Sequence, residues 1–141
     1  MVHASVHSVQ NKVRRPQAGI SLDVERCPTV PHVRAHLQSL LFNLLSNALK
    51  YAAPGRPPRI TVGAVPDAET GPPVLTVRDN GLGIDLDRFR PQLFQQFARF
   101  HAQVNGTGMG IYLINRIVES HGGCLKVASG VDVGTTFTLY L

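Results

Sequence analysis

The segment from Leu37 to Tyr51, LQSLLFNLLSNALKY, constrains the fold most, because it predicts a helix with two different faces. At about 100° per residue, one face is apolar and holds Leu37, Leu40, Leu41, Leu44, Leu45 and Ala48. The other face is polar and holds His36, Ser39, Asn43, Ser46, Asn47 and Lys50. The apolar face requires a second layer to cover it. The polar face is either a binding site or an exposed surface.

The composition of the polar face favours neither reading decisively. An exposed helix face is usually rich in Glu, Lys and Arg, which are better helix formers than Asn and Ser. Here the amides Asn43 and Asn47 lie four residues apart, beside Lys50. Amide oxygens suit a hard cation such as Mg²⁺, and the lysine adds a positive charge for phosphate. Two readings are equally compatible with this pattern. One is a site that holds a phosphate and a metal, and the other is a partly exposed polar face.

The remaining segments predict further helices and strands. We expect helices at 2–18, 91–100 and 109–121. We expect strands at 20–24, 59–65, 73–79, 124–129 and 135–141, with 59–65 and 73–79 paired as an antiparallel hairpin. No internal repeat or long linker divides the chain, so residues 1–141 are predicted to form a single domain. The predicted fold class is α+β, a two-layer α/β sandwich in which helices cover one face of a mixed, mostly antiparallel sheet.

Composition excludes several functional classes. No apolar run approaches the roughly 20 residues of a membrane span, and the first residues lack the apolar centre of a signal peptide. Cys27 and Cys124 are lone thiols without metal-ligand or disulfide spacing. We therefore expect a cytoplasmic domain without direct membrane contact. The net charge is +5, but the arginines are scattered, which argues against nucleic acid and leaves a small anionic ligand.

The segment DNGLGI places Asp79 at the end of an apolar strand and two glycines, Gly81 and Gly83, directly after it. A carboxylate at a strand end can accept a hydrogen bond from an exocyclic amine such as that of adenine, and glycines allow backbone to approach a flat ring. The alternative is a plain turn, because Asp-Asn-Gly is strong turn chemistry. On this segment alone the turn is favoured.

The segment NGTGMG places Gly106, Gly108 and Gly110 where a helix begins. Free N–H groups and the positive end of the helix dipole favour anions there, which predicts a phosphate-binding loop; the alternative is a plain glycine-rich connection. Neither the dinucleotide-binding pattern nor the P-loop pattern fits this loop, because no Gly-Lys-Ser/Thr follows its glycines and no buried parallel strand precedes them.

Five segments in order, NLLSNALKY, DNGLG, FARF, GTGMG and GTTF, resemble the N box, first glycine box, F box, second glycine box and last glycine motif of sensor histidine kinases. The similarity extends over nearly the whole chain. It implies the catalytic ATP-binding domain of the wider GHKL family of ATPases and kinases, with the Bergerat ATP-binding fold. ATP and Mg²⁺ are the implied cofactors.

The resemblance also implies roles for individual residues. Asn43 would coordinate Mg²⁺, and Asn43 and Lys50 would be the catalytic residues, with Asn47 and Lys50 against the phosphates. Asp79 would accept from the adenine amino group. Tyr51 would lie near the nucleotide, with Gly81 and Gly83 beneath the base, Thr135 and Thr136 at the back wall of its pocket, and Phe97 and Phe100 at the start of a lid. The lid and phosphate side would be formed by Gly106, Thr107, Gly108, Met109 and Gly110.

Two departures from the family pattern refine this reading. Ser39 stands four residues before Asn43, where many relatives carry Glu or Gln, which argues against a strong water-activating ATPase. Only HAQVN separates Phe100 from Gly106, so the lid is short.

His3 and His7 lack the following acid and downstream proline of a phosphoacceptor helix, and the other four histidines, His32, His36, His101 and His121, lie within the implied ATP-binding domain. The implied partners are therefore ATP, a separate dimerisation domain that carries the phosphoacceptor histidine, and a response regulator. The alternatives are a non-catalytic ATP-sensing or docking module and an ATP-driven clamp.

Overall fold

The computed structural model describes residues 19–23, 34–66, 73–95 and 110–140. Predictions for other residues, the helix at 2–18 among them, lie outside the described residues. The elements along the chain are β1 (Gly19–Asp23), α2 (Arg34–Lys50), β2 (Arg59–Pro66), β3 (Pro73–Asp79), α3 (Leu86–Phe89), a 3₁₀ helix η1 (Arg90–Gln92), α4 (Gly110–Ser120), β4 (Cys124–Gly130) and β5 (Gly134–Tyr140).

The strands form one five-stranded sheet in the order β1-β2-β3-β5-β4. β1 and β2 are parallel, and the other neighbours are antiparallel. The predicted hairpin is confirmed as the pairing of β2 with β3. The mixed, mostly antiparallel sheet is therefore confirmed as well.

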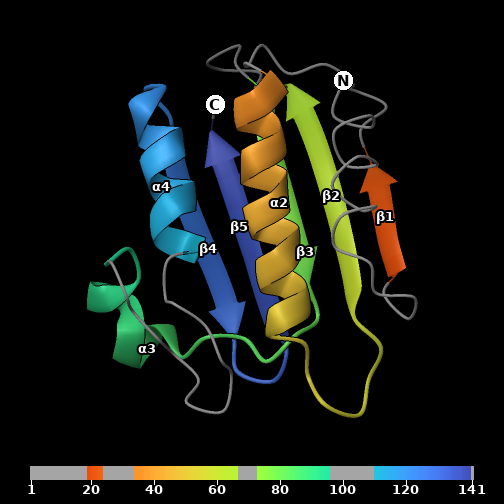
Figure 1. The fold of residues 1–141 in the computed structure, drawn as a ribbon. Helices are drawn as coiled ribbons and strands as arrows, with labels where there is room; N and C mark the ends of the chain where they lie inside the picture. The colour runs from red at the N-terminus through yellow and green to blue at the C-terminus, as the bar shows by residue number, and fades with distance from the viewer. Residues whose placement is uncertain (1–18, 24–33, 67–72, 96–109, 141) are drawn as a thin grey trace.

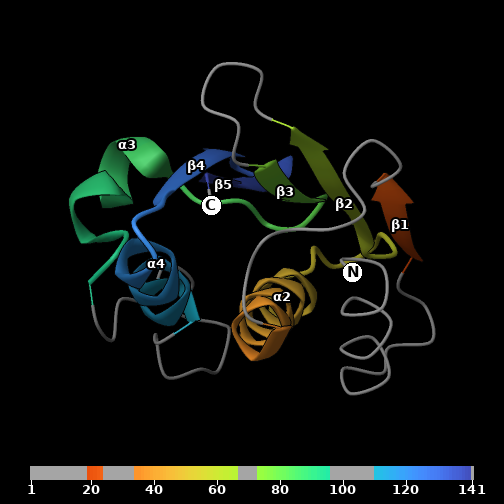
Figure 2. The same ribbon diagram turned by 90° about the horizontal axis from the view of Figure 1, so that it is seen from above.

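Helices α2 and α4 lie side by side on one face of this sheet (Figure 1), and the view from above separates the two layers (Figure 2). The six residues of the predicted apolar face of α2 are all buried, with at most 4% of any of them exposed. They pack in one core with Ile114 and Val118 of α4 and with strand residues such as Val62 and Leu75. The predicted two-layer α+β fold is confirmed.

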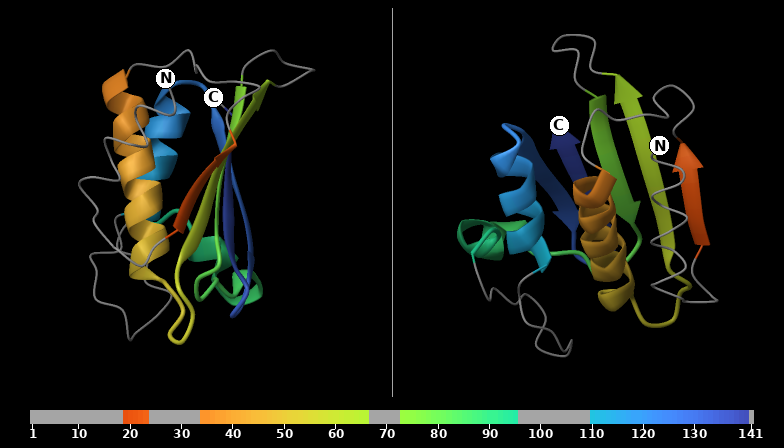
Figure 3. Two further views of the ribbon diagram at one scale, coloured as in Figure 1. Left: turned by 90° about the vertical axis from the view of Figure 1, so that its right-hand side faces the viewer. Right: turned by 45° about the horizontal axis from the view of Figure 1, so that its top comes forward.

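Side chains alternate between the two faces along β3 and β5, as the period of two in a strand requires. Leu75 and Val77 of β3 and Phe137 of β5 are buried beneath the helices, whereas Arg78 is exposed. Asp79, which is half-buried, lies on the same face as Leu75 and Val77 by the same alternation. The strand therefore directs the carboxylate of Asp79 toward the helices. The side view in Figure 3 shows the sheet edge-on, with the helices along one face.

The predicted helix at 91–100 is wrong over its described part. The helical turns begin earlier, at Leu86, where the carboxylate of Asp85 caps α3 by accepting from the backbone N–H of Arg88 at 3.3 Å. Pro91 lies within η1, because a proline without an N–H fits the first turn of a helix. Residues 96–100 lie outside the described residues.

The predicted helix at 109–121 is found as α4, and Gly122, with φ +77°, follows its end. Among the residues that the structure describes, no helix is both long and apolar enough to cross a lipid bilayer.

Candidate functional site

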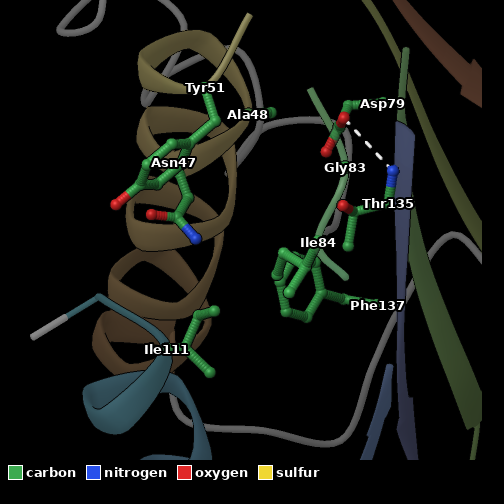
Figure 4. Close-up of a pocket in the computed structure, with 9 residues that line it drawn as sticks. All are labelled: Asn47, Ala48, Tyr51, Asp79, Gly83, Ile84, Ile111, Thr135 and Phe137. Atoms are coloured by element: carbon green, nitrogen blue, oxygen red, sulfur yellow. Dashed lines mark hydrogen bonds between the residues drawn. The ribbon is translucent and has the colours of Figure 1, made fainter. Parts of the chain in front are cut away.

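A pocket that is partly open to solvent lies between the sheet and the two helices. Figure 4 shows the residues that line it, which come from α2 and the residue after it, from the start of α4, from the end of β3 and the segment that follows, and from β5. The lining residues are Asn47, Ala48, Tyr51, Asp79, Gly83, Ile84, Ile111, Thr135 and Phe137. The structure thus brings together five of the residues singled out in the sequence: Asn47, Tyr51, Asp79, Gly83 and Thr135.

Asp79 is the acidic group of this pocket. Its Oδ1 accepts hydrogen bonds from the backbone N–H of Gly81 at 2.8 Å and of Thr135 at 3.3 Å. Within the described chain, no donor is recorded for Oδ2. Burial raises the pKa of Asp79 above its usual value, and the two backbone hydrogen bonds partly offset that increase. The carboxylate is therefore held in place through one oxygen and offers the other to a ligand donor.

The loop after Asp79 needs glycine at two positions, for different reasons. Gly83 has φ +72°, and a Cβ there would lie 2.0 Å from the carbonyl oxygen of Gly130, so no side chain fits. Its backbone lines the pocket. Gly81 is not among the lining residues, and its predicted place beneath the base stays a prediction. A Cβ on Gly81 would lie 2.5 Å from the carbonyl oxygen of Tyr51, so this glycine permits close packing on the end of α2.

On the helical side, the pocket is lined by Asn47 of α2, by Tyr51 directly after this helix and by Ile111 of α4, with β5 on the opposite side. Gly110, the first residue of α4, lies against Asn47, because a Cβ on Gly110 would be 3.0 Å from Asn47 Oδ1. The amide face of α2 and the start of α4 therefore meet at this pocket. The other members of the predicted phosphate loop, Gly106, Thr107, Gly108 and Met109, lie outside the described residues.

Asn43 and Lys50 are not among the residues that line the pocket. Asn43 lies one turn before Asn47, and its Nδ2 donates to the carbonyl oxygen of Ser39 at 2.8 Å. This bond leaves the amide oxygen of Asn43 as an acceptor. Lys50 is exposed, and its Nζ lies 5.7 Å from the centroid of the Tyr51 ring. Their predicted metal and phosphate roles stay predictions.

The two threonines of β5 lie on opposite faces of the sheet. Thr135 is buried and lines the pocket, whereas Thr136 is not among the lining residues, and its predicted place at the back wall stays a prediction. The alternation of the strand explains the difference. The Thr135 hydroxyl lies 2.9 Å from the hydroxyl of Ser129, which accepts from the backbone N–H of Ile84 at 2.7 Å.

Sequence reasoning missed four lining residues and one supporting residue. Ala48, Ile84, Ile111 and Phe137 are apolar, so each reads as an ordinary core residue in the sequence. Ser129 supports the site through its bond to Ile84. One usable signal was position, since Ile84 directly follows Gly83 and Phe137 lies two residues beyond Thr135, on the same face of its strand.

Residues 32–141 match the family described as histidine kinase-, DNA gyrase B- and HSP90-like ATPases. The chain is 35% identical, over 99% of its length, to the methanogenesis regulatory histidine kinase FilI of Methanothrix harundinacea. It is 33% identical, over 97% of its length, to the circadian input-output histidine kinase CikA of Synechococcus elongatus. It spans only 16% and 18% of the lengths of these two relatives.

Solved structures share the fold. The mycobacterial sensor histidine kinase MprB superposes with a TM-score of 0.77 at 25% identity, over 98% of this chain and 90% of that one. The full-length histidine kinase ShkA, in complex with AMPPNP, superposes with a TM-score of 0.78 at 20% identity, over 98% of this chain and 28% of that one. The fold, the pocket and the match over residues 32–141 agree: the chain belongs to the family of histidine kinase-, DNA gyrase B- and HSP90-like ATPases, and within it to the ATP-binding catalytic domains of histidine kinases.

Proposed function

We propose that this chain binds Mg·ATP in the described pocket and positions the γ-phosphoryl group for transfer to a histidine on a separate dimerisation domain of a sensor kinase. One observation carries the proposal: Asp79 at the end of β3, Asn47 of α2 and Ile111 at the start of α4 line a single pocket. ShkA, which shares this fold, was solved in complex with AMPPNP, and this supports a nucleotide as the ligand.

The adenine would lie at the sheet end of the pocket. There Oδ2 of Asp79 accepts from the exocyclic amine, and the side chains of Ile84, Ile111 and Phe137 give the ring apolar contacts. The backbone of Gly83 borders the same space, so a flat ring can approach it closely. A purine with an amine donor therefore matches both the polar and the apolar parts of this cavity.

The phosphates would extend along the amide face of α2 toward the start of α4. Among the described residues, no cluster of three or more His, Cys, Asp or Glu side chains could hold a metal ion. We propose that the Asn43 oxygen would hold a magnesium ion together with phosphate oxygens and water, which agrees with the few protein ligands that Mg²⁺ takes. Asn47 and Lys50 would contact the phosphates.

In the reaction, a nitrogen of the acceptor histidine attacks the γ-phosphorus, the bond to the β-phosphate oxygen breaks, and ADP leaves. Catalysis of this transfer is mainly alignment and charge neutralisation. The nucleophile comes from another domain, so the chain has no need to activate water, which agrees with a serine at position 39. We propose a downstream response regulator as the next acceptor and a cytoplasmic location.

The test is to mix the chain with the histidine-bearing dimerisation segment of its parent protein and γ-labelled ATP. Labelled phosphohistidine on the segment, lost in an Asp79→Asn variant, is the expected result. ATP binding without transfer would instead identify a nucleotide-sensing module. Absence of ATP binding by the wild-type chain would refute the proposal.

A further inference from the structure

The backbone of the loop at Asn80–Leu82, between Asp79 and Gly83, is held by hydrogen bonds from three directions. The N–H of Leu82 donates to the carbonyl oxygen of Tyr51 at 2.8 Å, and the carbonyl oxygen of Leu82 accepts from the N–H of Asp132 at 2.8 Å. Arg56 supplies the third set. Because Asp79 and Gly83 both line the pocket, the shape of this loop sets the distance between them.

Arg56 donates three short hydrogen bonds, all to main-chain carbonyl oxygens. Its Nε bonds to the oxygen of Asn80 at 2.7 Å, and its Nη2 bonds to the oxygens of Gly81 at 3.0 Å and Asp132 at 2.6 Å. One guanidinium therefore joins three segments: its own loop after α2, the loop after β3, and the turn between β4 and β5. A planar fork of several N–H donors makes this possible, and a lysine ammonium cannot reproduce it.

The side chain of Asn80 strengthens the same junction from the other side. Its Oδ1 accepts from the backbone N–H of Arg59 at 2.8 Å, and its Nδ2 donates to the carbonyl oxygen of Pro57 at 3.2 Å. Residues 56–59 and the loop at 80–82 are thus joined by side-chain-to-backbone hydrogen bonds in both directions.

We propose that Arg56 is a positioning residue for the nucleotide pocket, holding the Asn80–Leu82 loop in the shape that sets Asp79 and Gly83 around the base. This inference rests on the proposed binding of ATP in that pocket. Arg56 is exposed, so its loss removes no core packing. Its loss frees two loop carbonyls and lets the loop sample other shapes, which weakens a site that depends on preorganisation.

The experiment compares the wild-type chain with Arg56→Ala, Arg56→Lys and the control Arg116→Ala by calorimetric titration with ATP. Arg116 is also exposed, and no side-chain hydrogen bond is recorded for it within the described residues. We expect the ATP Kd of Arg56→Ala to rise about tenfold, equivalent to ~1.4 kcal/mol, and that of Arg116→Ala to stay unchanged. Arg56→Lys keeps the charge but not the fork, so we expect it to restore only part of the loss.

Chemical rescue separates positioning from general stabilisation. Methylguanidinium at low millimolar concentration should tighten ATP binding by Arg56→Ala, and methylammonium should not. If wild-type binds ATP while Arg56→Ala matches Arg116→Ala, the inference is overturned and the proposed function stands. If wild-type does not bind ATP, the proposed function itself fails. If Arg56→Ala does not fold, Arg56→Lys decides, and wild-type affinity in that variant overturns the inference.

Discussion

Replacing Asp79 by asparagine tests base recognition directly, because the change is nearly isosteric. An asparagine keeps one oxygen, which still accepts from the N–H groups of Gly81 and Thr135. It replaces the other oxygen with an NH₂ donor, which would face the amine of adenine, donor against donor. The loss of a hydrogen bond to a charged acceptor is worth about 1.5–3 kcal/mol, so we expect the ATP Kd to rise roughly ten- to 150-fold.

Calorimetric titration measures this change, and a second ligand sharpens it. Purine riboside triphosphate lacks the exocyclic amine, so the wild-type chain should prefer ATP over it, and Asp79→Asn should lose that preference. Asp87→Asn is the matched control, because Asp87 is an exposed residue of α3 and does not line the pocket. Unchanged ATP affinity in Asp79→Asn, or a preference for ATP that survives the substitution, would refute the assigned role.

The same variant makes a prediction about the pH dependence of stability. Because burial raises the pKa of Asp79 in the folded state, the folded chain holds this proton more tightly than the unfolded chain does. The free energy of unfolding therefore falls as pH rises from the usual Asp pKa through the raised one. We expect ligand-free Asp79→Asn to be at least as stable as wild-type at pH 7, and urea unfolding should show this advantage shrinking as the pH falls through the raised pKa of Asp79 and gone below about pH 4.

Three further substitutions test other parts of the structure. Asn43→Asp should shift the magnesium dependence of ATP binding more than the preference for adenine, and an identical magnesium titration would count against a metal ligand at this position. Gly83→Ala should lower the free energy of unfolding in urea by more than ~2 kcal/mol. Gly55→Ala should cost less, because Gly55 has a similar φ but a Cβ there would have no atom within 4 Å, and equal losses would contradict the close approach of Gly83 to Gly130. Leu44→Ala, at a side chain 1% exposed, should cost about 2–5 kcal/mol, far more than Phe42→Ala at 42% exposure, and similar unfolding midpoints would contradict the packing of α2.

The sequence was sufficient for those features whose residues repeat with a clear period. The leucines of α2 predicted which face of the helix is buried. The alternation of apolar and polar residues predicted β3 and β5 as strands with one buried face. Asp79 was identifiable because a carboxylate that ends an apolar strand is unusual, and Asn47 because amides are uncommon on an exposed helix face.

Other features depend on distances that no local pattern encodes. Arg56 reads as one arginine of a proline-rich loop, and only the fold brings it to the carbonyls of Asn80 and Asp132. The apolar residues that line the pocket cannot be distinguished from residues of the hydrophobic core by residue type alone. Thr135 and Thr136 look alike in the sequence, and only the register of β5 assigns each of them to a face of the sheet.

The position of the pocket within the sheet has a consequence for its robustness. Asp79 and Thr135 belong to β3 and β5, which pair with each other and have further strands on both sides, whereas β1 and β4 form the margins of the described sheet. Fraying at β1 breaks ladder bonds only with β2 and leaves both recognition groups in register. The outermost parallel strand can therefore diverge in sequence among relatives, or open transiently, with little effect on how the base is read.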